Sequence, residues 1–263
     1  MLSKLLKYDL KWMIKIVCIY YVLGIIFAVL GRIFSLLPDS LIFNIIEGIC
    51  KGAALSLVIT GLINSVIRAW VRMVTNMYKD ESYLTHTLPI DIKMHFLSKV
   101  LSVLIMVLLS VVAILSTVFI MYYSKENLEI LKTSINLISS GLDVSTFAFI
   151  FLVTVVVMLE IIYIVFVGFL GITIGHSFNN AKLGKSFLFG IIIYFGCNVI
   201  SMFILLIGSI FSNNLFNAMF KGSEVEYGLL VTIMIVAIVL YSIYNVVIYL
   251  LTNKLLSKGV NVD

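Results

Sequence analysis

One acidic residue, Glu160, lies in the middle of a long apolar stretch, where few side chains carry charge. A carboxylate at the centre of a bilayer costs at least about 2.5–3.5 kcal/mol, so we expect Glu160 to face the protein interior, to be protonated, or both. It could contact a substrate or a transported proton. It could instead be a structural carboxyl group that is hydrogen-bonded to an amide on a neighbouring helix, such as Asn64 or Asn198. The sequence leaves both interpretations open.

The sequence lacks the common motifs of catalysis, nucleotide binding and metal binding. Gly184-Lys185-Ser186 resembles the end of a phosphate-binding loop, but the first glycine of that motif would have to be Asn179. The histidines and cysteines have no spacing typical of a metal site or of a disulfide framework: His86, His95, His176, Cys18, Cys50 and Cys197. We therefore expect no catalytic, cofactor or metal site, and no enzymatic activity in this chain.

The composition is that of a membrane protein. Of the 263 residues, 62% are hydrophobic and only 12% are charged. Soluble domains hold about 45–50% apolar and about 25% charged residues, so this chain could not cover itself with polar surface. The net charge of +5 comes without a basic patch interleaved with aromatic residues, and we expect no nucleic-acid partner.

Six apolar stretches each approach the roughly 20 residues that a bilayer-spanning helix needs. They are Ile14–Leu37, Gly52–Ile67, Val100–Tyr123, Thr146–Ile174, Phe187–Phe211 and Gly228–Leu251. The second stretch is rich in small and hydroxyl residues, which favour packing against other helices, and its pattern continues to Met77. The sequence therefore predicts an all-α polytopic membrane protein with six transmembrane helices in a single domain, residues 1–263.

Residues 1–15 have the periodicity of an amphipathic helix. Leucines fall on one face, and Lys4, Lys7, Lys11 and Lys15 fall on the other. Such a helix lies in the headgroup layer, with its lysines toward anionic membrane lipid. A signal peptide is the competing interpretation, but the basic region is long and no clear small-residue cleavage site follows Ala28.

The distribution of lysine and arginine predicts the orientation of the chain. If the N-terminus is cytoplasmic, thirteen of the 18 basic residues lie in inner segments and five in outer segments. The five outer residues are Arg32, Lys51, Lys125, Lys132 and Lys221. Because basic residues favour the inner side, we expect both termini in the cytoplasm and the chain in a plasma membrane.

The longest polar interruption is the segment 76–99, which this orientation places in the cytoplasm. Pro89 must break any helix there, because proline lacks an amide hydrogen and disfavours helix in the preceding residue. Before Pro89, a short helix could begin with Asp80 and Glu81, where the helix dipole favours acids. That helix would present an apolar face consisting of Tyr83, Leu84 and Leu88. The alternative is an ordinary solvated loop, and the residues alone do not decide between the two.

Two stretches resemble motifs of small bacterial ATP-binding-cassette (ABC) permeases of the type 2 export class. The first is Asp80-Glu81-Ser82-Tyr83-Leu84-Thr85-His86-Thr87-Leu88-Pro89, followed by Leu97-Ser98-Lys99. It is similar to the family pattern Asp-Glu-Gly-Tyr-Leu-Thr-x-Thr-Leu-Pro … Ser-Lys. The second stretch, Gly175–Ser186, resembles a Gly-Gln-x-Phe-x-x-x-Lys pattern before the fifth span. Ser82 stands where glycine is usual and His176 where glutamine is usual, and we expect both at the surface.

The resemblance implies a role for each part of the chain. The segment between spans two and three would be the cytoplasmic coupling helix, which docks on a separate ABC ATPase subunit. Its ATPase-coupling residues would be Asp80, Glu81, Tyr83, Leu84, Leu88 and Pro89. Residues 1–15 would be the family's connecting helix, and a second permease copy or paralogue would complete a dimer around the transport cavity.

The sequence is compatible with three functions, and the resemblance favours the first of them. The chain would be the membrane subunit of an ATP-driven exporter, moving an amphiphile such as a peptide antibiotic, lipid or drug. Alternatively it is a stand-alone carrier or channel with Glu160 as its coupling group. A membrane-embedded enzyme is the third, and the missing nucleophile–base and metal motifs argue against it.

Overall fold

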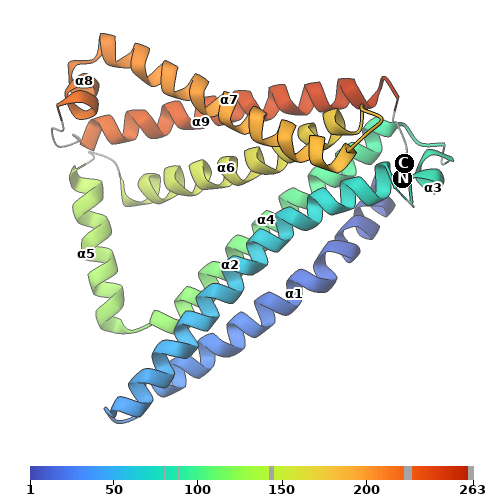
Figure 1. Cartoon of the computed structure of the whole chain (residues 1–263). Coiled ribbons are helices and arrows are strands. Elements are labelled where there is room, and N and C mark those ends of the chain that lie inside the picture. Colours follow the sequence, from blue (N-terminus) through green and yellow to red (C-terminus); the bar gives the residue numbers. More distant parts are fainter. Residues whose placement is uncertain (80, 88, 142–144, 222–226, 260–263) are drawn as a thin grey trace. The chain divides into compact units, whose positions relative to one another are not determined.

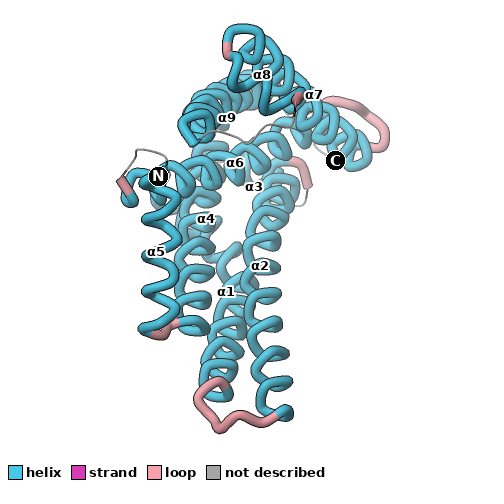
Figure 2. The backbone as a smooth tube through the Cα atoms, turned by 90° about the vertical axis from the view of Figure 1, so that its left-hand side faces the viewer, coloured by secondary structure: helices cyan, strands magenta, loops and turns pink. Residues whose placement is uncertain are grey.

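The computed structural model describes residues 1–79, 81–87, 89–141, 145–221 and 227–259. Every regular element in this part of the chain is a helix, as predicted (Figures 1 and 2). In chain order the helices are α1 (Leu2–Phe34), α2 (Leu41–Met77), α3 (Ser82–Thr87), α4 (Ile92–Tyr122), α5 (Lys125–Gly141), α6 (Thr146–Gly175), α7 (Lys182–Phe211), α8 (Asn213–Phe220) and α9 (Tyr227–Leu256).

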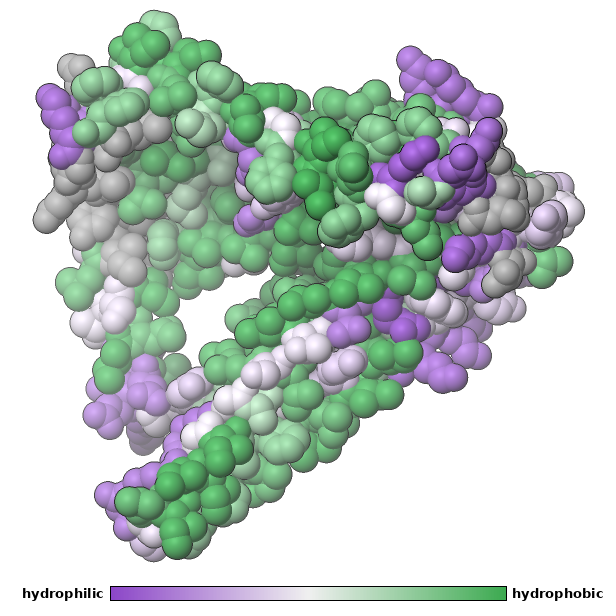
Figure 3. All heavy atoms as spheres, viewed as in Figure 1, coloured by the Kyte–Doolittle hydropathy of each residue, from purple (hydrophilic) through white to green (hydrophobic). Residues whose placement is uncertain are grey.

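Six of these helices are long and apolar enough to cross a membrane, namely α1, α2, α4, α6, α7 and α9. Their candidate spans hold 28 to 37 residues, which exceeds the roughly 20 that a bilayer requires. On the face shown in Figure 3, apolar residues cover the long helices and hydrophilic residues gather toward helix ends. The chain is therefore a polytopic membrane protein, and the six predicted stretches each fall within one of the six helices or overlap it closely.

The helices form two compact units, the first running from Met1 to Glu129 and the second beginning at Ile130. In the first unit, α1, α2 and α4 pack side by side along their lengths (Figures 1 and 2). Small residues allow the close approach: a Cβ on Gly24 would lie 2.6 Å from Cγ1 of Val58. Ala28, Ala54 and Met121 form a fully buried cluster farther along the same helices.

In the second unit, α6 packs against both α7 and α9. A Cβ on Gly171 would lie 2.8 Å from the backbone of Gly190 and of Ser186, so glycine is needed where α6 meets α7. Tyr163 is buried at the contact of α6 with its two neighbours, with 2% of its surface exposed.

The first fifteen residues do not form a helix of their own. The structure has one continuous helix, α1, from Leu2 to Phe34, because nothing in its sequence interrupts the hydrogen-bonded ladder before Ser35. The predicted division of faces is present, since Lys4, Lys7, Lys11 and Lys15 are exposed. The opposite face is packed in protein, with Asp9 and Met13 buried.

The connection between α2 and α4 contains the short helix α3 of 6 residues, which is one of the two alternatives that the residues alone left open. The helix ends at Thr87, and Pro89 lies in the bend that follows. The next helix, α4, begins after Asp91, whose carboxylate accepts a hydrogen bond from the amide of Lys93 at 3.0 Å. Pro89 and this N-cap together separate α3 from α4.

Candidate functional site

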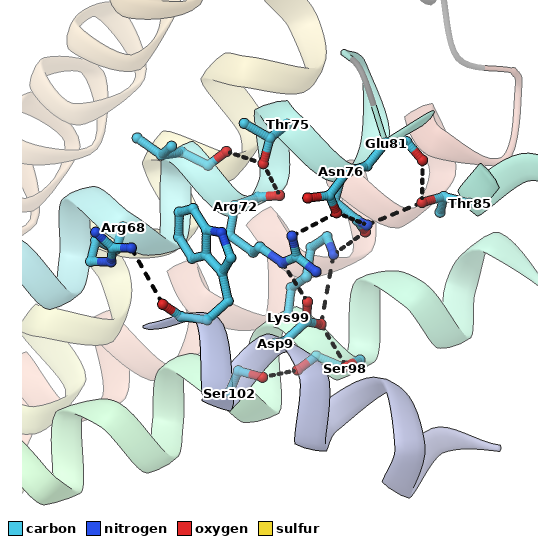
Figure 4. Close-up of polar contacts among 12 residues, drawn as sticks. Asp9, Arg68, Arg72, Thr75, Asn76, Glu81, Thr85, Ser98, Lys99 and Ser102 are labelled. Carbon is cyan, nitrogen blue, oxygen red and sulfur yellow. Dashed lines mark hydrogen bonds and ion pairs between the residues drawn. The ribbon is translucent and has the colours of Figure 1, made fainter. Parts of the chain in front are cut away.

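A network of charged and polar side chains joins α1, α2, α3 and α4 in the first unit (Figure 4). Its centre is Arg72 on α2. The guanidinium Nε donates to Oδ1 of Asp9 at 2.8 Å, and Nη1 donates to Oε2 of Glu81 at 2.7 Å. One arginine therefore ties the N-terminal part of α1 to the segment that leads into α3.

Asp9 is almost fully buried, with 4% of its surface exposed. Its second oxygen, Oδ2, accepts a hydrogen bond from Ser98 Oγ at 2.8 Å and lies 3.7 Å from Lys99 Nζ. Burial of a carboxylate is unfavourable unless its oxygens are paired and hydrogen-bonded, and both oxygens of Asp9 are. The carboxylate thus holds α1 against α2 and α4 at once.

Lys99 is the second buried cation of the network, with 3% of its surface exposed. Its ammonium donates to Oδ1 of Asn76 at 2.6 Å. The two cations, Arg72 and Lys99, balance the two acids, Asp9 and Glu81, so the network carries no net charge. Balanced charge is the condition under which a buried ionic cluster is tolerated.

Asn76 connects this network to α3. Its amide Nδ2 donates to Oε2 of Glu81 at 3.2 Å and to Oγ1 of Thr85 at 3.0 Å. Thr85 Oγ1 in turn donates to the backbone oxygen of Glu81 at 2.9 Å. A helix of 6 residues is too short to be stable alone, so these contacts fix α3 against the end of α2.

A second tie between α1 and α2 lies one helical turn away. The Arg68 guanidinium stacks over the Trp12 ring, with 4.2 Å from its central carbon to the ring centroid. Its Nη2 also donates to the backbone oxygen of Trp12 at 3.3 Å. The Arg72 guanidinium lies 5.5 Å from the same ring, so both arginines contribute cation–π contacts to the α1–α2 interface.

The outward side of α3 is apolar and exposed. Tyr83 and Leu84 leave 69% and 73% of their surfaces exposed, whereas Ser82 and Thr85 are buried against the first unit. Large, exposed apolar side chains on a helix that is held in place by hydrogen bonds offer a surface for a binding partner. Of the predicted ATPase-coupling residues, Pro89 is also exposed, and Asp80 and Leu88 lie outside the described residues.

Glu81 is among the residues that the resemblance implies for ATPase coupling, together with Tyr83 and Leu84. Its carboxylate bonds to Arg72 and Asn76, and 44% of the side chain stays exposed. The buried guanidinium of Arg72 needs a second acceptor, and Glu81 is the acid that supplies it.

The two departures from the family pattern are buried and not at the surface, which corrects our expectation. Ser82 is 0% and His176 1% exposed. Ser82 begins α3 on the side that packs against the rest of the first unit. In the second unit, His176 Nδ1 lies 2.9 Å from the backbone oxygen of Ile172 and 3.3 Å from Ser186 Oγ.

Glu160 lies near the midpoint of α6 and is exposed. The suggested amide in the same unit, that of Asn198, is not bonded to it. Asn198 Nδ2 donates to the backbone oxygen of Tyr194 at 2.8 Å, within its own helix. Asn64, in the other unit, likewise donates to the backbone oxygen of Thr60 at 3.0 Å.

Asp9, Arg72 and Asn76 were not predicted as site residues, and Lys99 was noted only as part of the motif resemblance; the sequence did contain a signal for Asp9. Asp9 falls among the leucines of α1 on the apolar face, opposite the four lysines. An acid in that position needs a buried cation. Two arginines, Arg68 and Arg72, lie four positions apart in the polar continuation of the second span. They are candidates for the cation that Asp9 requires.

Among the residues that the structure describes, no three histidine, cysteine or acidic side chains gather as a metal site would require. No protein-family model matches this sequence, and neither a curated protein nor a solved structure is significantly similar to it.

Proposed function

We propose that the chain is the membrane-spanning permease subunit of an ATP-driven exporter of the ABC type. In this proposal α3 is the coupling helix, and Tyr83 and Leu84 contact a separate ATPase subunit on the cytoplasmic side. The observation that carries the proposal is that a short helix with two exposed apolar side chains, Tyr83 and Leu84, is connected to three spanning helices by one largely buried ionic network.

The physical argument concerns the transmission of force. A loop that is only solvated would absorb a push by rearranging its backbone. The helix α3 cannot do so independently, because Glu81 and Thr85 are bonded to Arg72 and Asn76 of α2. A displacement of Tyr83 by a partner would therefore move the ends of α1, α2 and α4 together.

The remaining parts of the proposal follow from the resemblance and from the charge distribution. Both termini are cytoplasmic, the membrane is a bacterial plasma membrane, and a second permease copy or paralogue completes the transport pathway. The cargo is an amphiphile, such as a peptide antibiotic, lipid or drug. ATP hydrolysis takes place on the partner chain.

The proposal is tested by purifying the tagged chain from its native membranes in a mild detergent and identifying what copurifies. We expect an ABC ATPase subunit, with ATP hydrolysis and ATP-dependent transport after reconstitution. The double variant Tyr83→Ser/Leu84→Ser should lose the ATPase and keep the membrane fold. A matched control is Leu36→Ser, since Leu36 is 71% exposed in the turn just after the C-terminal end of α1. Transport without any ATPase or ATP would contradict the proposal.

A stand-alone carrier remains the second candidate because of one observation. Glu160 is an exposed acid near the midpoint of a span, and it has no ion pair within the described part of its unit. Transport that follows the proton gradient and is abolished in Glu160→Gln would favour this candidate over the exporter.

A further inference from the structure

The second unit contains a cluster of tyrosines where α6 meets α7 and α9. The ring of Tyr163 lies with its centroid 5.5 Å from that of Tyr241, 5.9 Å from that of Tyr244 and 5.9 Å from that of Tyr194. The hydroxyls of Tyr163 and Tyr244 donate to the backbone oxygens of Tyr194 and Cys197, both at 3.2 Å. Because these two hydroxyls are engaged within the protein, Tyr163 and Tyr244 contribute mainly their rings to the cluster.

Asn245 lies one helical turn after Tyr241 on α9 and is 8% exposed. Its Nδ2 donates to the backbone oxygen of Leu159 on α6 at 3.2 Å. Its Oδ1 is buried and has no hydrogen-bond partner in the described part of the protein. A buried amide oxygen without a donor is unfavourable, so a hydrogen-bond donor supplied by a ligand would stabilise it.

Glu160 follows Leu159 directly and precedes Tyr163 by three positions on α6. Residues three positions apart are neighbours on one face of a helix, so Glu160 lies beside Tyr163 on α6. The Tyr163 ring in turn packs against Tyr241 of α9, with 5.5 Å between the ring centroids. Within the described residues of this unit, no cation is paired with Glu160. The contact thus combines an acid, a buried acceptor and several aromatic rings.

We propose that Glu160, Asn245 and the rings of Tyr241 and Tyr244 form a binding site for the primary ammonium group of an amphiphilic ligand. The carboxylate supplies the opposite charge, and Asn245 Oδ1 accepts an N–H hydrogen bond. The electron-rich ring faces attract the cation, and the surrounding helices accommodate an apolar tail. The inference names the ligand class of the proposed exporter, and in that respect it rests on the proposed function.

Other ligand classes fit these groups less well. An anion would face a carboxylate and an amide oxygen, both of which repel it. A quaternary ammonium could contact the rings and Glu160, but it has no N–H for Asn245 Oδ1. A metal ion would find only one carboxylate, since no group of three ligating side chains gathers among the described residues.

The test uses the full chain in nanodiscs of phosphatidylcholine, which carries no net charge. Binding of the fluorescent primary amine monodansylcadaverine is compared with binding of its N-acetyl derivative, which has the same fluorophore and tail without the charge. We expect the amine to bind at least about tenfold more tightly. Glu160→Gln should abolish this preference, and Glu160→Asp should keep part of it, which shows that the charge matters and not the fold.

Two further pairs of variants separate the roles. Tyr241→Phe keeps the ring and should bind the amine as the original chain does, whereas Tyr241→Leu should bind it several-fold more weakly. Asn245→Leu should also weaken amine binding, and Glu126→Gln, which removes an exposed acid on α5, should leave it unchanged. Equal binding of the two probes by the original chain would overturn the inference, as would an amine preference that survives in Glu160→Gln.

The binding assay needs neither ATP nor a partner, so its outcome is independent of the ATPase copurification described above. An amine preference without a copurifying ATPase would overturn the exporter and support the ammonium site. An ATPase-coupled chain without an amine preference would overturn the ammonium site alone.

Discussion

Arg72 on α2 bonds to Asp9 on α1 at 2.8 Å, although 63 positions separate them in the chain. The same guanidinium holds Glu81 just before α3. The pairing is the link between the expected docking helix and the body of the first unit. Through Arg72, the N-terminal turns of α1 are connected to the segment that leads into α3.

Replacement of Arg72 by glutamine should destabilise the protein strongly. The change leaves Asp9 buried with only the more distant Lys99 to balance it, and removal of one partner from a buried ion pair typically costs about 3–5 kcal/mol. The measurement is the thermal unfolding of the purified chain in detergent. Lys11→Gln removes an exposed cation from α1 and should change little. A chain with Arg72→Gln that unfolds like the Lys11→Gln control would show that the network is not a structural tie.

Replacement of Glu81 by glutamine should affect coupling more than stability. The side chain is 44% exposed, and exposed ion pairs contribute only about 0–1 kcal/mol. Without the charge, α3 is held less firmly, so the amount of substrate moved per ATP hydrolysed should fall while the ATPase stays bound. The reconstituted complex gives both rates, with Glu126→Gln as the control. An unchanged ratio would exclude a transmitting role for Glu81.

Gly24→Ala should weaken the packing of α1 on α2. The added Cβ would lie 2.6 Å from Val58 Cγ1, and overpacking of a tight contact costs about 1–3 kcal/mol. Thermal unfolding should show the loss, and a second change, Val58→Ala, should recover part of it. At Gly52 a Cβ meets nothing within 4 Å, so Gly52→Ala is the matched control and should not destabilise. Equal stability of the two glycine variants would argue against the close approach of α1 and α2.

Thiol labelling tests the predicted orientation. In a chain whose Cys18, Cys50 and Cys197 are replaced by alanine, Leu84→Cys and Leu36→Cys place single thiols at positions that are 73% and 71% exposed. A membrane-impermeant maleimide should label Leu36→Cys in right-side-out vesicles and Leu84→Cys only in inside-out vesicles. The reverse pattern would contradict the orientation that the lysine and arginine distribution predicts.

The long elements could be predicted from the sequence because each depends on local properties. Apolar length alone identifies the six long helices, and Pro89 with Asp91 separates α3 from α4. The continuation of α2 to Met77 could also be predicted from its periodicity. The junction of residues 1–15 with the first span could not, because amphipathic and uniformly apolar helix turns form the same ladder of hydrogen bonds.

The candidate site could be predicted only in part. Tyr83 and Leu84 are exposed on α3, as their pattern indicates. The inward direction of Glu81 depends on Arg72 of another helix, and no local spacing contains that information. The burial of Ser82 has the same origin, since it is decided by the packing of α3 against the rest of the unit.

The central claim, that α3 docks on an ATPase, is tested most directly by site-specific photo-cross-linking in native membranes. A benzophenone amino acid would replace Tyr83 in one variant and Leu36 in the control, since both side chains are strongly exposed. The account predicts that the probe at Tyr83, and not the probe at Leu36, cross-links the chain to an ABC ATPase subunit. Cross-linking of Tyr83 to no ATPase, in membranes where the chain is folded and transport is active, would contradict it.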